Sequence, residues 1–75
     1  MTDKLKFTKI TSDGIISDVD KMTLKEMQEF VGGYIEYVGN VICNEDGRML
    51  ELPVNKLKDQ FVGNIIIQNW FDEDD

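Results

Sequence analysis

The stretch from Thr23 to Glu26 constrains the fold more than any other part of the sequence. It has the pattern of a capping box, in which the Thr23 hydroxyl accepts from the Glu26 amide while the Glu26 carboxylate accepts from the Thr23 amide. Apolar residues then recur at helical spacing until Gly32 or Gly33, either of which can supply the left-handed position at which a helix ends. The pattern predicts a helix over about residues 24–32.

The segment before this helix predicts a β-hairpin. Residues 4–10 alternate apolar and polar side chains, and we assign Leu5, Phe7 and Ile10 to one face of a half-buried strand. A Ser-Asp-Gly turn follows, and residues 15–19 can return as the partner strand.

The segment after the helix predicts two further strands and a hairpin. Residues 34–38 and 41–43 are rich in strand formers, with Gly39 between them. An Asp-Gly pair at residues 46–47 suits a hairpin turn, so residues 48–52 are expected to pair with residues 41–43.

The last third of the chain predicts a second helix and a final strand. Asn55 can cap a short helix over residues 56–61, and residues 65–71 form the last strand. We therefore expect an α+β domain over residues 1–71. It would have a mostly antiparallel sheet, one capped helix packed on it and a short second helix.

The small size of the chain favours a homo-oligomer. Seventy-five residues leave much surface exposed after folding, and one cysteine with no histidine allows neither an internal disulfide nor a structural zinc site. Ile65, Ile66 and Ile67 make the last strand apolar on both faces. This favours a subunit contact over a strand wrapped by its own helices. We expect a dimer or a tetramer.

The net charge of −7 comes from 15 acidic and 8 basic residues, and residues 72–75 are all acidic. We interpret these four as a disordered, solubilising tail rather than an interaction arm. The acidic balance disfavours binding to nucleic-acid polymers or anionic membranes. No segment suits a signal peptide or a membrane span, which together with a lone thiol predicts a cytoplasmic protein.

Enzymatic and metal chemistry find little support in the sequence. Histidine, the most frequent general acid or base, is absent. Cys43 has no imidazole to activate it, and its Val-Ile-Cys context predicts a core position. Residues 44–47 lack the rest of a calcium-binding loop. We expect a non-enzymatic protein without a metal or a cofactor.

Three residues in the polar turns suit a small anionic or planar ligand. Arg48 is the only arginine, and its planar fork fits a phosphate, a carboxylate or a guanine edge. The alternative is a surface pair between Arg48 and Glu45 or Asp46. Asn55 and Lys56, at the start of the expected second helix, can offer amides and a positive charge to an anion. The alternative there is plain capping by Asn55.

The glycine pair and the aromatic residues add further candidates. One glycine suffices to end the helix, so Gly33 is the better candidate for a close approach to a ligand. Tyr34 and Tyr37 are three residues apart and face opposite sides of a regular strand. We expect Tyr34 to contact a ligand and Tyr37 to lie in the core or an interface. Trp70 can likewise either stack on a planar ligand or lie at a subunit contact. The Asn44 side chain carries a donor and an acceptor that suit a purine edge.

Three motifs, taken in order, resemble a family of small, mainly phage-encoded proteins of unknown function. They are Val-Gly-Gly-Tyr-Ile-Glu at residues 31–36, Ile-Cys-Asn-Glu-Asp-Gly-Arg at 42–48 and Leu-Pro-Val-Asn-Lys at 52–56. The resemblance covers about residues 24–68. Lys56 stands where many relatives have arginine, which favours a point-charge contact over a bidentate one.

Small oligomeric phage proteins of this type include the anti-CBASS sponges, which bind host cyclic-nucleotide signals without cleaving them. The resemblance implies a non-enzymatic anti-defence protein that sequesters a cyclic dinucleotide in a pocket between subunits. The alternative is a small acidic inhibitor of a host protein, for example a DNA mimic, although interspersed lysines weaken the mimic. A structural virion or accessory subunit is a third interpretation. The expected ligand-binding residues are Gly33, Tyr34, Asn44, Arg48, Asn55, Lys56 and Trp70.

Overall fold

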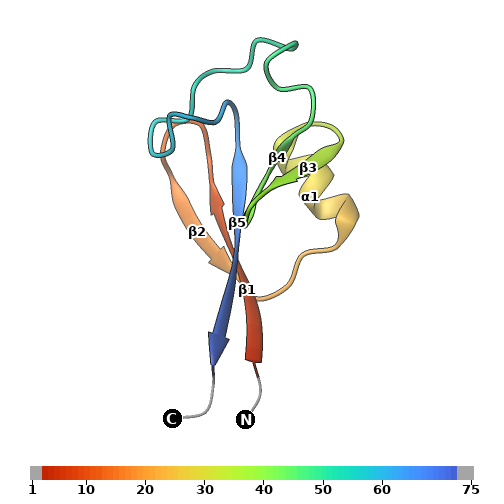
Figure 1. Ribbon diagram of the computed structural model, residues 1–75, viewed down its shortest axis with the longest axis vertical. Coiled ribbons are helices and arrows are strands. Elements are labelled where there is room, and N and C mark those ends of the chain that lie inside the picture. Colours follow the sequence, from red (N-terminus) through yellow and green to blue (C-terminus); the bar gives the residue numbers. More distant parts are fainter. Residues whose placement is uncertain (1–2, 73–75) are drawn as a thin grey trace.

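The structure is a computed structural model that describes residues 3–72, with side chains described for residues 6–69. Five strands form one antiparallel sheet in the order β2-β1-β5-β4-β3, and one helix packs on it (Figure 1). In chain order the elements are β1 (Asp3–Ile10), β2 (Ile16–Val19), α1 (Leu24–Val31), β3 (Ile35–Val38), β4 (Val41–Asn44) and β5 (Ile65–Asp72).

The sheet is built around the long central pair β1 and β5. These two strands are in register from Asp3↔Asp72 to Ile10↔Ile65. The hairpin strand β2 pairs with only the last four residues of β1, and β4 pairs with only Ile66 and Ile67 of β5. The outer halves of β1 and β5 therefore continue as a two-stranded ribbon toward the termini (Figure 1).

The predicted capped helix is confirmed. The Thr23 Oγ1 accepts from the Glu26 amide at 3.1 Å, and the Thr23 amide donates to Glu26 Oε1 at 2.8 Å. Gly32 ends the helix in the left-handed conformation, with φ 85°. These contacts are local in sequence, which is why the residue pattern alone placed both ends of α1.

The helix covers one face of the sheet with an apolar core. Met27 and Val31 of α1 pack against Phe7, Ile42 and Ile66 from the three central strands. Ile42 and Ile66 have no exposed surface. We call this side of the sheet the helix face (Figure 1).

The opposite face is covered by the long loop of residues 45–64, and we call it the loop face. Ile10, Val41 and Cys43 are buried there with Ile65, and Phe61 of the loop packs against them. Leu5, Phe7 and Ile10 were assigned to one face, but Phe7 and Ile10 lie in different clusters because an odd spacing reverses the side of a strand.

At Ile65 and Ile66, both apolar faces of β5 are therefore covered by the chain itself. Ile66 is buried under α1, and Ile65 is buried under the loop. From the sequence alone, the apolar second face of this strand favours a subunit contact. Because the loop of the same chain covers Ile65, no subunit contact is required to bury it. A homo-oligomer stays a prediction.

The expected α+β class is wrong. Within residues 3–72 the only helix is the eight-residue α1, so the domain is mostly β and the second helix at residues 56–61 does not form. The Asn55 amide donates to the Phe61 carbonyl at 2.9 Å, and Val54 bridges to Val62. The chain turns back within this short span, which leaves no length for a helix.

The expected hairpin between residues 41–43 and 48–52 is also wrong. The second edge of β4 pairs with β5, and residues 45–51 form successive turns. The Leu52 amide donates to the Gly47 carbonyl at 3.1 Å, and Glu51 adopts φ 56°. A β-carbon on Gly47 would lie 2.8 Å from Val62 Cγ2, so close packing rather than a hairpin explains this glycine.

The C-terminal strand runs as far as Asp72, and the remaining acidic residues 73–75 lie outside the described residues. The expected tail thus overlaps the end of β5 by one residue. The single helix in residues 3–72 is far too short to cross a membrane.

Candidate functional site

A pocket of about 360 Å³ lies on the loop face, between the β3–β4 hairpin and the loop. We call it the Phe61 pocket. Its volume falls in the range of small-molecule sites, which begins at about 300 Å³. The side chains that matter most are Glu36, Val38, Cys43, Arg48, Met49 and Phe61.

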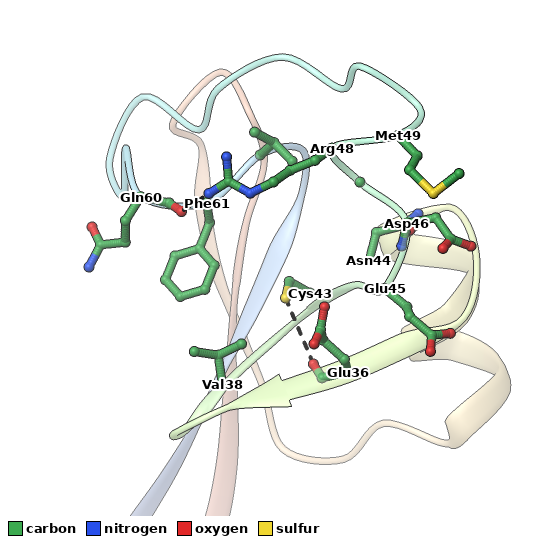
Figure 2. Close-up of a pocket in the computed structure, with 12 residues that line it drawn as sticks. Glu36, Val38, Cys43, Asn44, Glu45, Asp46, Arg48, Met49, Gln60 and Phe61 are labelled. Atoms are coloured by element: carbon green, nitrogen blue, oxygen red, sulfur yellow. Dashed lines mark hydrogen bonds between the residues drawn. The ribbon is translucent and has the colours of Figure 1, made fainter.

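The walls of this pocket come from three separate segments. Val38 and Cys43 lie on neighbouring strands, and Figure 2 shows the Phe61 ring and the Arg48 side chain arching over from the loop. Val38 and Cys43 share a face because the register pairs Glu36 with Cys43 and Val38 with Val41. The floor is therefore apolar, and the charged groups stand around it.

The charges around the pocket are unbalanced. Three carboxylates line it, from Glu36, Glu45 and Asp46, against the single guanidinium of Arg48. Figure 2 shows Glu36 beside Cys43, while Glu45 and Asp46 extend on the side away from Phe61. Arg48 Nη2 donates to the Gln60 carbonyl at 3.3 Å, which holds its side chain across the pocket. The alternative of an Arg48 pair with Glu45 or Asp46 is not the contact that the structure shows.

Cys43 is buried in the loop-face core, as predicted. Its Sγ lies 3.9 Å from the Glu36 carbonyl oxygen (Figure 2). Burial raises the pKa of the Cys43 thiol, and the nearby Glu36 carboxylate raises it further. The thiol therefore stays protonated and behaves as an apolar group in the pocket floor.

Asn44 and Gly33, two expected ligand contacts, instead contact each other. The Asn44 Nδ2 donates to the Val31 carbonyl at 3.0 Å, and its Oδ1 accepts from the Asp46 amide at 2.7 Å. A β-carbon on Gly33 would lie 3.1 Å from Asn44 Nδ2. Gly33 thus makes room for the buried Asn44 side chain. The side-chain amide of Asn44 forms its hydrogen bonds with the backbone of the same chain.

Asn55 is buried completely and satisfied by the backbone. Its Nδ2 donates to the carbonyls of Thr11 at 3.1 Å and Gly63 at 2.9 Å, with a longer contact of 3.4 Å to Ile10. Its Oδ1 accepts from the amides of residues 57 and 58 at 3.0 and 3.1 Å. The Asn55 side chain therefore caps the backbone of a turn. Capping is the alternative to ligand binding that the sequence allows, although the helix expected after Asn55 does not form.

Tyr34, Tyr37 and Lys56 do not line the pocket. Tyr34 is 70% exposed and Tyr37 is 55% exposed, so neither tyrosine is in the core of this chain. Lys56 is exposed, and its amide donates to the Ser12 carbonyl at 3.0 Å, near the β1–β2 turn. The side chain of Trp70 lies outside the described side chains. Of the seven expected residues, Arg48 and Asn44 line the pocket.

Sequence reasoning missed four of the six main wall residues, Glu36, Val38, Met49 and Phe61. Glu36 and Val38 alternate along β3 on the side of Cys43, so the strand period together with the hairpin register could have found them. Phe61 carried no such signal, since its place depends on the course of the loop. No group of three or more metal-binding side chains is brought together among the described residues.

Comparison with known proteins gives a family without an assigned activity. A family model described as a domain of unknown function (DUF3846) matches residues 5–75. Comparisons with curated proteins and with solved structures found no match.

Proposed function

Since the chain belongs to the DUF3846 family, whose function is unknown, we propose that it is a non-enzymatic protein that binds a nucleobase-bearing ligand in the Phe61 pocket. A cyclic dinucleotide immune signal is the first candidate ligand, sequestered by a phage protein in the host cytoplasm. The pocket supports the binding step. The anti-defence role and the cytoplasmic location are proposed from the sequence motifs and composition alone.

One observation carries this proposal: Phe61, Arg48 and Glu36 surround a single apolar floor. A nucleobase presents a flat π-face together with an edge of donors and acceptors. An aromatic ring can stack on the face, a guanidinium can donate to the N7 and O6 of guanine, and a carboxylate can accept from ring or exocyclic N–H groups. The three groups of the pocket match these three needs.

The charge of the pocket decides which part of a nucleotide it can take. With three carboxylates and one guanidinium, the lining repels a phosphate more than it attracts one. A neutral base therefore enters, while the phosphates stay at the mouth near Arg48. One pocket holds one base, so a cyclic dinucleotide would be shared between two copies of the chain.

The same lining supports binding without catalysis. The thiol in the floor has a raised pKa, which leaves little thiolate to act as a nucleophile. The expected result is that a bound nucleotide is recovered chemically unchanged after prolonged incubation, as mass spectrometry of the released ligand would show.

The test is calorimetric titration with adenosine, guanosine and a panel of cyclic dinucleotides. Arg48→Ala should weaken binding about tenfold or more, because a good contact to a base edge is worth about 1–3 kcal/mol. Lys58→Ala removes an exposed charge of the same loop and is the matched control, with affinity expected to be unchanged. Absence of heat and of thermal stabilisation with every ligand contradicts the proposal. Equal losses in both variants would indicate non-specific attraction.

Exposed apolar side chains on the loop favour a second candidate, direct inhibition of a host protein. Met49 is 84% exposed, and Leu50, Val54 and Leu57 are each exposed by about half. Apolar groups gathered on one loop are typical of protein-binding surfaces. A stoichiometric partner captured by the wild type and lost by Leu50→Glu would support this candidate. A partner retained by both proteins would contradict it.

A further inference from the structure

The strand β3 forms a free edge of the sheet. Within residues 3–72 it pairs with β4 alone, at the end of the order β2-β1-β5-β4-β3. Tyr37 and Val38 are exposed along this edge, and Glu36 is its only charged residue. No lysine or proline stands on this strand, although such residues commonly keep an edge from pairing with another chain.

The alternation of the antiparallel ladder shows which backbone groups point outward. The Glu45 amide donates to the Tyr34 carbonyl at 2.8 Å, which makes Tyr34 and Glu45 a hydrogen-bonded pair just beyond the strand. Bonded pairs recur every second residue, so Glu36 and Val38 direct their amides and carbonyls toward β4. Ile35 and Tyr37 therefore direct theirs away from the sheet.

We propose that a second copy of this chain pairs with β3 through its own β3, antiparallel and around a two-fold axis at Tyr37. The two Tyr37 residues would exchange both backbone hydrogen bonds, and their rings would lie side by side. The two sheets would then continue as one ten-stranded sheet. The proposal stands on the strand edge and does not rest on nucleotide binding.

In a symmetric pairing of two β3 strands, the two-fold axis can pass through either of the two middle residues, Glu36 or Tyr37. The side chains decide which of these two registers is more stable. An axis at Glu36 would set two carboxylates directly opposite each other, in a non-hydrogen-bonded pair where facing side chains lie closest. An axis at Tyr37 sets Glu36 opposite the partner's Val38. It places two tyrosines opposite each other, and cross-strand aromatic pairs are stabilising by about 0.2–1 kcal/mol.

The opposite edge of the sheet explains why the pairing belongs to β3. On β2, the Thr11 amide donates to the Ile15 carbonyl at 3.0 Å, and the same alternation leaves Ile16 and Asp18 directed outward. An axis at Asp18 would bring two carboxylates together. The β2 edge thus carries a charge at one of its two outward-directed positions, whereas both outward-directed positions of β3, Ile35 and Tyr37, are uncharged.

Pairing at β3 would also bring two Phe61 pockets onto one surface. Glu36 and Val38 line the pocket and lie on the edge strand itself. A two-fold axis perpendicular to the sheet keeps the loop faces of both copies on the same side. The partner's Val38 would then stand beside Glu36 and extend the pocket wall.

A cysteine scan tests the register, with Cys43→Ala as the background so that no other thiol is present. Bonded cross-strand pairs have Cα atoms about 5.5 Å apart, inside the range of about 4.4–6.8 Å that a disulfide spans. Tyr37→Cys should therefore form a covalent dimer under mild oxidation. Glu36→Cys should not, since its counterpart is displaced along the strand. Faster cross-linking at residue 36 than at residue 37 would overturn the proposed register.

Sedimentation without any nucleotide tests the pairing itself. The wild type should have about twice the monomer mass at high micromolar concentration, and Tyr37→Lys should be monomeric because a buried pair of charges opposes the contact. Ser17→Lys, on the exposed β2 edge, is the matched control and should stay dimeric. A monomeric wild type, or equal disruption by both lysines, overturns the proposal. Since ligand is absent, failure here leaves the nucleotide titration unaffected.

Discussion

The two faces of the sheet are covered in different ways. The helix face is closed by α1, whose backbone satisfies its own hydrogen bonds, so apolar contacts from Met27 and Val31 suffice to seal it. The loop face is closed by an irregular segment whose backbone groups need partners from elsewhere. Buried asparagine side chains supply them, above all Asn55. An irregular cover therefore depends on buried polar groups where a helix depends on apolar packing.

The two covers are also joined to each other. Asn64 Nδ2 donates to the Phe30 carbonyl at 2.9 Å, and Asn44 Nδ2 donates to the Val31 carbonyl at 3.0 Å. Both carbonyls belong to the last turn of α1, which has no basic residue to satisfy them. Asn44, the last residue of β4, and Asn64, the last residue of the loop, thus cap the helix on the opposite face of the sheet.

The largest expected effect comes from truncating the core of the helix face. Ile66→Ala should lower the free energy of unfolding by about 3–4 kcal/mol, because a buried cavity remains under a rigid helix. Ile65→Ala removes the same atoms on the loop face and is the matched comparison. It should cost less, since an irregular loop can collapse into the space. Urea unfolding of both variants measures the difference, and equal losses would show that the two covers are equally rigid.

The next effect tests the dependence of the loop on its asparagine. Asn55→Ala should destabilise the protein by about 2–3 kcal/mol, because it leaves buried carbonyls and amides without partners. The loss should be local. Hydrogen exchange should accelerate at the amides of Leu57 and Lys58 and remain slow in α1.

An exposed asparagine gives the control for this prediction. Asn40→Ala, in the turn between β3 and β4, removes an exposed side chain and should change stability by less than about 0.5 kcal/mol. Uniform acceleration of exchange across the sheet and helix in Asn55→Ala would contradict a separate loop cover.

The smallest effect is a dependence on pH that only the loop face should show. Its core holds Cys43, whose pKa is raised above the ordinary value of 9.0 first by burial and then by Glu36. The folded state therefore binds this proton more tightly than the unfolded state. The resulting stability is fully present below pH 9.0 and is lost as the pH rises through the folded pKa.

Urea unfolding of the wild type and Cys43→Ala across alkaline pH measures the stability that depends on protonation of the Cys43 thiol. The wild type should lose an increment of stability that Cys43→Ala does not lose. Alkylation of the thiol should begin at lower pH in Glu36→Gln, which removes one cause of the raised pKa. Parallel pH curves for the wild type and Cys43→Ala would contradict the prediction.

The elements that the sequence predicted correctly share local contacts. The capping box, the Gly32 end of α1 and the strands on each side of Gly39 depend on residues within a few positions of one another. The wrongly predicted elements all fall in residues 45–64, and one further error, the assignment of Phe7 and Ile10 to one face, lies in β1. Within residues 45–64, Gly47 packs closely against Val62, and the Asn55 side chain donates a hydrogen bond to the Thr11 carbonyl. Neither contact produces a periodic pattern in the sequence.

The candidate site residues also differ in how well residue type alone identified them. Arg48 stood out as the only arginine, and the structure does place it over a pocket. Gly33, Asn44 and Asn55 looked like ligand contacts because glycine and asparagine serve both backbones and ligands. Within the chain, Asn44 and Asn55 donate to backbone carbonyls and Gly33 packs against Asn44, while a ligand contact by these residues stays a prediction.

By itself the sequence determined one capped helix, the strand-rich segments and the scarcity of catalytic groups, because each of these depends on residue type and short-range spacing. Only the tertiary structure decided that the loop, rather than a second helix, closes the far face of the sheet. It also decided that the asparagines serve the backbone and that Phe61, Arg48 and Glu36 meet. Contacts between distant segments are set by how the whole chain buries its apolar surface and satisfies its polar groups, and no local pattern encodes that balance.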